Sequence, residues 1–265
     1  MATQSSIEWT ESTWNPVIGC DKVSAGCKHC YAERMAKRLA SMARALEAKG
    51  QNPGRLSHYT KVLSKNHKWN GRLIQDPDAL LDPLGWRAPR TIFVNSMSDL
   101  FHPDVPLVFI RQVFSVMNRC PQHTFQILTK RPEITAQYDA ELNWTPNIWM
   151  GTSVERADVV SRIDDLRRTS AHIHFLSIEP LIGPLNDLDL SHIEWAIVGG
   201  ESGPGARPMK ESWVRSLRDQ CLAADVPFFF KQWGGIQKHR TGRELDGRIW
   251  DEMPNVSYEV DAVSI

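Results

Sequence analysis

The sequence predicts an α/β protein built as a partial (β/α) barrel of six or seven parallel strands. From about residue 91 onward, short β-rich runs alternate with helical patterns, and strands that alternate with helices pair in parallel through right-handed crossovers. Six or seven such units are too many for a small open sheet and slightly few for a full eight-unit barrel. A single open doubly wound sheet is the alternative. Both architectures place function at the C-terminal ends of the strands.

The predicted strands are short runs rich in β-branched and aromatic residues. In chain order they cover residues 13–18, 91–95, 124–128, 147–150, 172–178, 193–198 and 226–230.

Apolar residues at helical spacing predict helices between most of these strands. The first is a long helix with an apolar face made of Met35, Leu39, Met42 and Leu46. The segment after the third strand opens with Pro132, which suits a first helical turn. The other helical patterns cover residues 110–117, 159–166 and 213–221, and after the fifth strand a helix is weak or missing.

Residues 1–265 are predicted to form a single domain with one insertion and a tail. Residues 50–90 are rich in Pro, Gly, Asn and basic residues, so we interpret them as an insertion between the first helix and the second strand. Within it, Trp69-Asn70-Gly71 predicts a hairpin turn. Residues 235–265 are polar and are expected to wrap the barrel.

The composition is that of an ordinary soluble globular protein. With 42% apolar and 23% charged residues, it excludes a disordered chain or a coiled coil. No stretch approaches the ~20 continuous apolar residues of a membrane helix, and the N-terminus shows no secretory signal. Five cysteines, an odd number, do not form a disulfide framework. These observations predict a reducing, cytoplasmic setting without membrane contact.

Three of the five cysteines form the most informative motif. Cys20, Cys27 and Cys30 are spaced C-x6-C-x2-C on a loop between the first strand and the long helix. A structural zinc site closes with four ligands, and an electron-transfer [4Fe-4S] cluster normally has four cysteines. Three ligands instead leave one iron of a four-iron cluster open to a substrate or cofactor.

Two plainer interpretations of this motif stay open. The cysteines can form a zinc site completed by His29 or a distant residue, or they can be unliganded core residues. The remaining two, Cys120 and Cys221, lie late in helical segments and are expected to be buried as small hydrophobic residues.

A three-cysteine loop after the first strand of a partial barrel resembles the radical S-adenosylmethionine (SAM) superfamily. The usual spacing there is C-x3-C-x2-C, whereas this chain has six residues in the first gap. Nearly the whole chain also resembles the phage-associated three-cysteine-motif family of radical-SAM-like proteins. The motifs that carry this resemblance are residues 14–20, 93–102, 128–133, 151–155, 176–180, 198–207 and 229–234.

The resemblance implies an enzyme with two cofactors. Cys20, Cys27 and Cys30 would bind a [4Fe-4S] cluster whose open iron is chelated by SAM. One electron, from a donor such as flavodoxin or ferredoxin, would cleave SAM to methionine and a 5′-deoxyadenosyl radical. That radical would abstract hydrogen from a substrate.

The resemblance also implies roles for polar residues at the ends of the second, third and fourth strands. Ser96, Ser98 and Asp99 would lie where the superfamily binds the methionyl amino group, with Asp99 as an acceptor. Lys130 or Arg131 would pair with the SAM carboxylate, Arg in bidentate geometry. Ser153 and Glu155 would hold the ribose hydroxyls.

The ends of the last three strands carry the remaining candidates. Glu179 is a candidate to orient another group or to bind substrate. Gly199 and Gly200, followed by Glu201, would let the backbone approach adenine or a substrate closely. This loop lacks both common phosphate-binding patterns. We expect Lys231, Gln232 and Trp233 on the substrate side of the barrel mouth. The alternative for Trp233 is that it only packs on the rim of the barrel.

A basic segment next to the cysteine loop bears on the substrate. Residues 34–72 contain ten Lys or Arg and one acid, Glu47, although the whole chain has no net charge. The segment also carries aromatic rings and imidazoles, at His58, Tyr59, His67 and Trp69. It is either a solvated helix face with a basic loop or a surface for an anionic polymer.

The favoured substrate is therefore a nucleic-acid base or nucleotide, in a modification or repair reaction such as DNA modification, with base stacking on aromatic rings as the mode of binding. The alternatives are a radical SAM enzyme that acts on a small molecule or peptide, and a non-enzymatic, zinc-stabilised binding protein.

Overall fold

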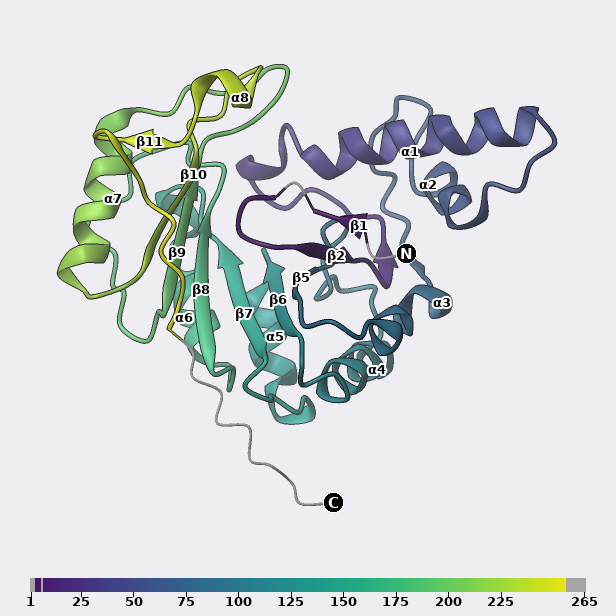
Figure 1. Cartoon of the computed structure of the whole chain (residues 1–265), viewed down its shortest axis with the longest axis horizontal. Helices are drawn as coiled ribbons and strands as arrows, with labels where there is room; N and C mark the ends of the chain where they lie inside the picture. The colour runs from purple at the N-terminus through teal and green to yellow at the C-terminus, as the bar shows by residue number, and fades with distance from the viewer. Residues whose placement is uncertain (1–2, 6, 256–265) are drawn as a thin grey trace.

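Seven parallel strands lie side by side in chain order and curl into a half-barrel (Figure 1). The structure is a computed structural model that describes residues 3–5 and 7–255. The parallel strands are β2 (Ser12–Trp14), β5 (Thr91–Val94), β6 (Thr124–Thr129), β7 (Ile148–Ser153), β8 (Ile173–Ile178), β9 (Trp195–Gly199) and β10 (Phe228–Gln232). The predicted partial barrel is confirmed. The doubly wound alternative is wrong, because the strand order has no reversal.

The first predicted strand divides into two. β2 belongs to the main sheet, where β1 (Thr3–Gln4) pairs with it antiparallel. β3 (Val17–Ile18) instead pairs antiparallel with β4 (Ile74–Gln75) in a separate two-stranded sheet. Pro16 lies between β2 and β3, and proline cannot donate to a sheet ladder, which accounts for the break.

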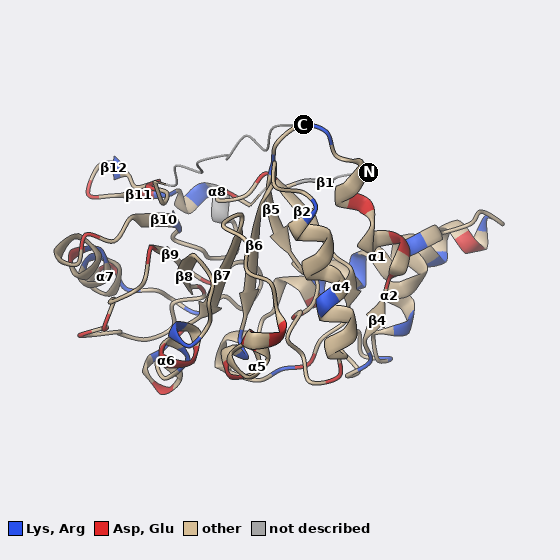
Figure 2. Cartoon of the chain, turned by 90° about the horizontal axis from the view of Figure 1, so that it is seen from below, with Lys and Arg blue, Asp and Glu red and all other residues tan. Residues whose placement is uncertain are grey.

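Helices cover the outer face of the sheet in most of the crossovers (Figures 1 and 2). Ile110, Val113, Phe114 and Met117 are buried on α4, as their spacing predicts. The link between β8 and β9, residues 179–194, has no helix, which also agrees with the sequence. The crossover helices are α1 (Tyr31–Ala48), α4 (Leu107–Asn118), α5 (Pro132–Tyr138), α6 (Arg162–Arg167) and α7 (Glu211–Ala223), with short 3-10 turns at η1 (Ala25–Cys27), η4 (Asp139–Glu141) and η5 (Ala157–Val159).

The first helix, α1, buries a face that only partly overlaps the one its apolar residues suggest, since Leu39 alone of the predicted face packs on the core of this region. Met35 and Met42 are 40% and 46% exposed. The residues that α1 does bury in contact with its neighbours are mainly alanines, at positions 32, 36, 40 and 43. Small side chains let the adjacent segment lie close to the helix.

Residues 54–85 supply the short elements that follow α1. They are η2 (Gly54–Leu56), α2 (Ser57–Lys61), β4, α3 (Pro77–Leu80) and η3 (Asp82–Gly85). The hairpin in this segment is displaced from its predicted turn at 69–71. Leu63 and Trp69 form an antiparallel bridge, and the turn between them is closed by a hydrogen bond from the Ser64 amide to the Lys68 carbonyl.

After β10 the chain forms α8 (Lys238–Thr241), β11 (Glu244–Leu245) and β12 (Arg248–Ile249). The Phe230 amide donates to the Trp250 carbonyl, so this segment lies along β10. The part of the predicted tail beyond residue 255 lies outside the described residues. Within residues 3–5 and 7–255, no helix combines the length and apolarity needed to span a membrane.

The concave face of the half-barrel is filled by aromatic rings near the amino ends of the strands. Trp9, Phe93, Trp149, Phe175 and Trp195 belong to one buried cluster, and the rings of Trp9 and Phe93 are 4.8 Å apart. Because side chains alternate along a strand, the polar residues at the carboxyl ends lie above this aromatic layer. The fold thus directs candidate chemistry to the carboxyl ends of the strands.

Gly151 gives this aromatic layer a direct test. A Cβ atom at Gly151 would lie 2.6 Å from Cδ2 of the Phe175 ring. We therefore expect Gly151→Ala to lower the free energy of unfolding by about 1–3 kcal/mol through overpacking. Gly85→Ala is the control, since a Cβ there meets nothing within 4 Å. Its effect should stay within about 0.5 kcal/mol. Urea titration measures both, and equal effects would contradict this account of the layer.

Candidate functional site

The cysteine loop, residues 19–30, lies across the carboxyl ends of the strands. It is folded tightly against the rest of the chain at two glycines. A Cβ atom at Gly26 would lie 2.8 Å from Oε1 of Glu155. At Gly19, where φ is +101°, a Cβ atom would collide with the Arg72 carbonyl oxygen. Only glycine accepts both demands without strain. The loop position is therefore specified by its contacts with the strand ends, and three carboxylates make those contacts.

The first anchor joins Asp21 of the loop to the ends of β5 and β6. Arg131 is buried, and its Nη1 lies 2.9 Å from Oδ2 of Asp99 while its Nη2 pairs with Asp21. Asp99 also accepts from the Thr129 hydroxyl at 2.7 Å and from the Lys130 amide at 3.1 Å. Both partners of Arg131 are thus protein carboxylates, one from the loop and one from the sheet.

The second anchor is Glu155, which follows β7 and is fully buried. Its carboxylate accepts hydrogen bonds from the Ser24 hydroxyl and, at 3.1 Å, from the Gly26 amide. Arg162 on α6 donates to it at 3.0 Å. Burial alone would raise the pKa of Glu155, but the charge of Lys130, the Ser24 hydrogen bond and the charge of Arg162 outweigh burial and lower that pKa. Glu155 is therefore an anion that holds the loop backbone.

The third anchor is Glu201, which follows β9. Arg207 donates to it from Nη2 at 2.6 Å and from Nε at 2.8 Å, and its Nη1 donates to the Ala25 carbonyl at 3.0 Å. Burial raises the pKa of Glu201, but the bonds from Arg207 outweigh it and the pKa is lowered. Together the three anchors tie Asp21, Ser24, Ala25 and Gly26 to four different strand ends.

The glycine-rich loop after β9 packs against the same region. Arg34 donates to the Ser202 carbonyl at 2.6 Å, and a Cβ atom at Gly203 would lie 2.7 Å from the Arg34 guanidinium. At Gly200 a Cβ would lie 2.7 Å from the Trp233 carbonyl carbon, and at Gly199 it would touch Glu179 and Lys231. These glycines have a packing role in the structure, and their role toward adenine stays a prediction.

The three thiols of the loop are free and half-buried. Burial and the charge of Asp99 raise the pKa of Cys20 to about 12, with Arg131 acting in the opposite direction. Charges on Cys30 and Cys27 raise it further, so both of these sulfurs lie within electrostatic reach of the Cys20 sulfur. Cys120 and Cys221 are each 1% exposed in the outer core, and their expected burial is confirmed.

Among the described residues, no group of three His, Cys, Asp or Glu side chains is arranged to hold one metal ion. A mononuclear site needs all donors around one centre, whereas the ligands of a multi-iron cluster each bind a different iron and stand farther apart.

The candidates at the carboxyl ends of β8 and β10 form a separate group. Nζ of Lys231 lies 2.8 and 2.7 Å from the two carboxylate oxygens of Glu179, and Nε2 of Gln232 lies 3.4 Å from Oε1 of the same carboxylate. Gln232 also donates to the Ser202 hydroxyl at 2.5 Å. Trp233 is half-buried on the Phe230 ring, with ring centroids 4.8 Å apart, in agreement with rim packing.

The predicted serines bond to the protein itself. The Ser96 hydroxyl donates to Asn15 at 3.1 Å, and that of Ser98 donates to the Val17 carbonyl at 2.9 Å. Ser153 is buried, and its carbonyl accepts from Arg162. Lys130 differs, because its half-exposed ammonium makes no hydrogen bond or close ion pair in the described part of the chain and acts on Glu155 only through its charge.

Several anchoring residues escaped the sequence analysis. Asp21 and Ser24 lie inside the cysteine motif, and Arg207 lies inside the glycine-rich motif, so their position in these motifs was an available signal. Arg162 carries no such signal, because it sits on an ordinary charged helix. Only the fold brings it to Glu155.

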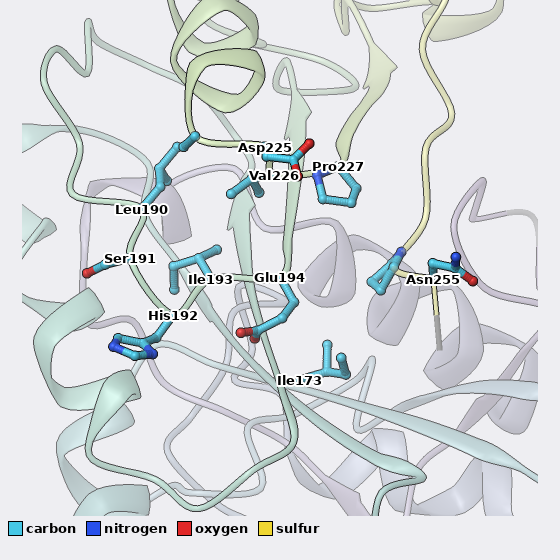
Figure 3. Close-up of a pocket in the computed structure, with 12 residues that line it drawn as sticks. Ile173, Leu190, Ser191, His192, Ile193, Glu194, Asp225, Val226, Pro227 and Asn255 are labelled. Carbon is cyan, nitrogen blue, oxygen red and sulfur yellow. The ribbon is translucent and has the colours of Figure 1, made fainter. Parts of the chain in front are cut away.

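A shallow pocket of about 350 Å³ lies at the opposite end of the half-barrel (Figure 3). It is lined at the amino ends of β8, β9 and β10, by residues that include His192, Glu194 and Asp225. Ligands of parallel α/β folds bind at the carboxyl ends of the strands, so this pocket is not the candidate site.

Comparison with known proteins gives one match. No curated protein and no solved structure matches the chain. A family model described as "Protein of unknown function (DUF5131)" matches residues 4–254. This range contains the cysteine loop, its three anchors and all seven parallel strands. The half-barrel is compatible with a radical-SAM-like fold, and the chain belongs to the DUF5131 family.

Proposed function

We propose that this protein is a radical SAM enzyme that acts on a nucleic-acid base or nucleotide. In this proposal Cys20, Cys27 and Cys30 hold a [4Fe-4S] cluster, SAM binds its open iron, and flavodoxin or ferredoxin supplies the electron. The observation that carries the proposal is the three-cysteine loop tied across the strand ends of a half-barrel by three carboxylate anchors.

The donor set fits a cluster with an open iron. Thiolates are preferred ligands of iron–sulfur clusters, and the loop offers three. The other cysteines, Cys120 and Cys221, are buried in the outer core and do not reach the loop as a fourth ligand. A zinc site completed by His29 has less support, because no three donors of the described residues are arranged around one ion.

Bound SAM would supply a 5′-deoxyadenosyl radical on one-electron reduction, and the chain's own residues would confine that chemistry. The aromatic layer excludes water from below the strand ends, which favours a reactive species acting on one chosen bond. Glu179 and Lys231, which take no part in the three anchors, offer one acceptor group and one donor group to a polar substrate.

The anchors change the division of roles that the resemblance implies. Asp99 and Arg131 are both occupied in holding Asp21, so we assign them to positioning the cysteine loop. Glu155, bonded to Ser24 and Gly26, takes the same role. The Lys130 side chain makes no hydrogen bond or close ion pair among the described residues, and its charge acts on Glu155 only from a distance. It is the cation that we assign to the SAM carboxylate.

Cysteine substitutions test the ligand set. After anaerobic reconstitution, the wild type should hold about four irons per chain and form 5′-deoxyadenosine with SAM and a reductant. Cys20→Ala, Cys27→Ala and Cys30→Ala should each lose the cluster, because three ligands are already the minimum. Cys120→Ala is the control and should keep its iron. A colourless wild type that retains zinc, or loss of iron in Cys120→Ala, would refute the assignment.

The second anchor predicts a positioning effect at a distance from the thiols. Glu155→Gln leaves Arg162 without its anionic partner and weakens the hold on Gly26. Residues that support metal ligands typically contribute about 10–100-fold to metal affinity, so we expect the cluster to be lost that much more readily to a chelator.

The matched control for Glu155→Gln is Asp158→Asn, which removes an exposed carboxylate three residues away. Hydrogen exchange at the Gly26 amide should accelerate in Glu155→Gln alone. Unchanged exchange and unchanged iron retention in that variant would show that the anchor does not position the loop.

Lys130→Gln tests the assignment of the carboxylate partner. A hydrogen bond to a charged group contributes about 1.5–3 kcal/mol, so SAM affinity should fall about 10- to 100-fold while iron content stays unchanged. Lys28→Gln, an exposed cation of the cysteine loop, is the control. Calorimetric titration of SAM into the reconstituted variants measures both. If Lys130→Gln binds SAM as tightly as the wild type, another residue must pair with the SAM carboxylate.

A further inference from the structure

The basic segment folds with α1 into one unit, residues 31–75, which we call the basic arm. The arm has its own small core, which includes Ala36, Ala40, Tyr59 and Val62. Figure 1 shows that α1 begins near the carboxyl ends of the strands and extends away from the sheet. With 18 residues, α1 is about 27 Å long.

The arm carries a large excess of unpaired positive charge (Figure 2). Of its ten Lys and Arg between residues 34 and 72, Arg34 bonds to Ser202, Arg55 pairs with Asp82, and Lys68 pairs with Glu33. The others are exposed and have no ion-pair partner within the described residues, namely Lys37, Arg38, Arg44, Lys49, Lys61, Lys65 and Arg72. Against them stands one exposed acid, Glu47.

The charges on α1 begin at the candidate site and lead outward. At 100° per residue, Lys37, Ser41 and Arg44 share one side of the helix, and Arg34 and Arg38 lie beside them. Arg34 marks the inner end of this side, because it donates to the Ser202 carbonyl in the loop after β9. An anion bound along the helix would thus be guided to the strand ends.

Most rings of the arm are at least partly buried, whereas Tyr31, at its inner end, is 47% exposed. Tyr59 is 8% exposed, and Trp69 packs against the core of the arm. The imidazole of His58 lies 3.4 Å from a buried carboxylate oxygen of Asp76. Burial leaves little of the Tyr59 ring for the predicted base stacking, and stacking on the partly buried Trp69 stays a prediction. What the surface offers is lysine and arginine, and these bind phosphate groups.

We propose that the basic arm is a docking surface for the phosphodiester backbone of a nucleic acid. A row of unpaired cations next to a polyanion releases condensed counterions, which gives affinity without sequence preference and a strong dependence on salt. This inference extends the proposed function by assigning the surface that would present its substrate. Docking itself needs neither cluster nor SAM, so it is testable independently.

The test is binding of fluorescently labelled oligonucleotides, as single-stranded DNA, duplex DNA and RNA of one length, by anisotropy between about 50 and 200 mM salt. The test variant is Lys37→Gln/Arg44→Gln. Gln keeps helix propensity close to that of Lys and Arg. The control is Arg87→Gln/Arg119→Gln, which removes two exposed, unpaired cations that precede β5 and β6, at the amino ends of the strands.

We expect wild type and control to bind at least one oligonucleotide with the same salt slope. The arm variant should bind more weakly, with a slope smaller by about one for each lost phosphate contact. Equal binding by the arm variant would overturn the proposal. The proposal would also be overturned if the protein bound none of the three oligonucleotides. Binding to anionic vesicles or to an acidic protein alone would count as that outcome.

The same variants separate this proposal from the radical chemistry. Reconstituted Lys37→Gln/Arg44→Gln should cleave SAM like the wild type when no nucleic acid is present. If the wild type binds nucleic acid through the arm but never forms 5′-deoxyadenosine, docking stands and the proposed function fails. If the wild type forms 5′-deoxyadenosine but binds no oligonucleotide, the docking proposal fails and the proposed radical chemistry stands.

Discussion

The candidate site depends on the pairing of buried carboxylates with arginines at the strand ends. Asp99, Glu155 and Glu201 are largely removed from water, and a buried charge is tolerated only when it is paired and hydrogen-bonded. Each carboxylate is linked to the cysteine loop, directly or through its arginine. The loop and the sheet therefore fold as one network, and neither is satisfied without the other.

This network also divides the mouth of the half-barrel into two parts. The three carboxylate anchors hold the cysteine loop in place, whereas the Glu179–Lys231 pair and the side-chain ammonium of Lys130 make no hydrogen bond to that loop. Groups that hold a site in place differ in kind from groups that meet ligands, because only the latter need to exchange partners. Parallel strands bring their carboxyl ends to one edge, so the anchors, Lys130 and the Glu179–Lys231 pair all lie at the same mouth.

Strand and helix periodicity predicted most of the fold, and residue spacing singled out the cysteine loop. Periodicity identified the buried face of α1 only in part, because the arm packs on alanines and Leu39 and leaves Met35 and Met42 40% and 46% exposed. It also missed the break at Pro16, where a local backbone constraint overrides a β-rich run. Arg162 was unpredictable for another reason. The crossover after β7 brings Arg162 next to Glu155. Nothing in the sequence around a charged residue on a short helix indicates such a partner.

The layer of Trp9, Phe93, Trp149, Phe175 and Trp195 has a consequence for the order of events at the site. It fills the interior of the half-barrel below the carboxyl ends of the strands with buried rings. Under the proposed function, two molecules that stack above this layer would both have to enter from the same side. The deeper one would then bind first and leave last, so the layer would impose an order of binding.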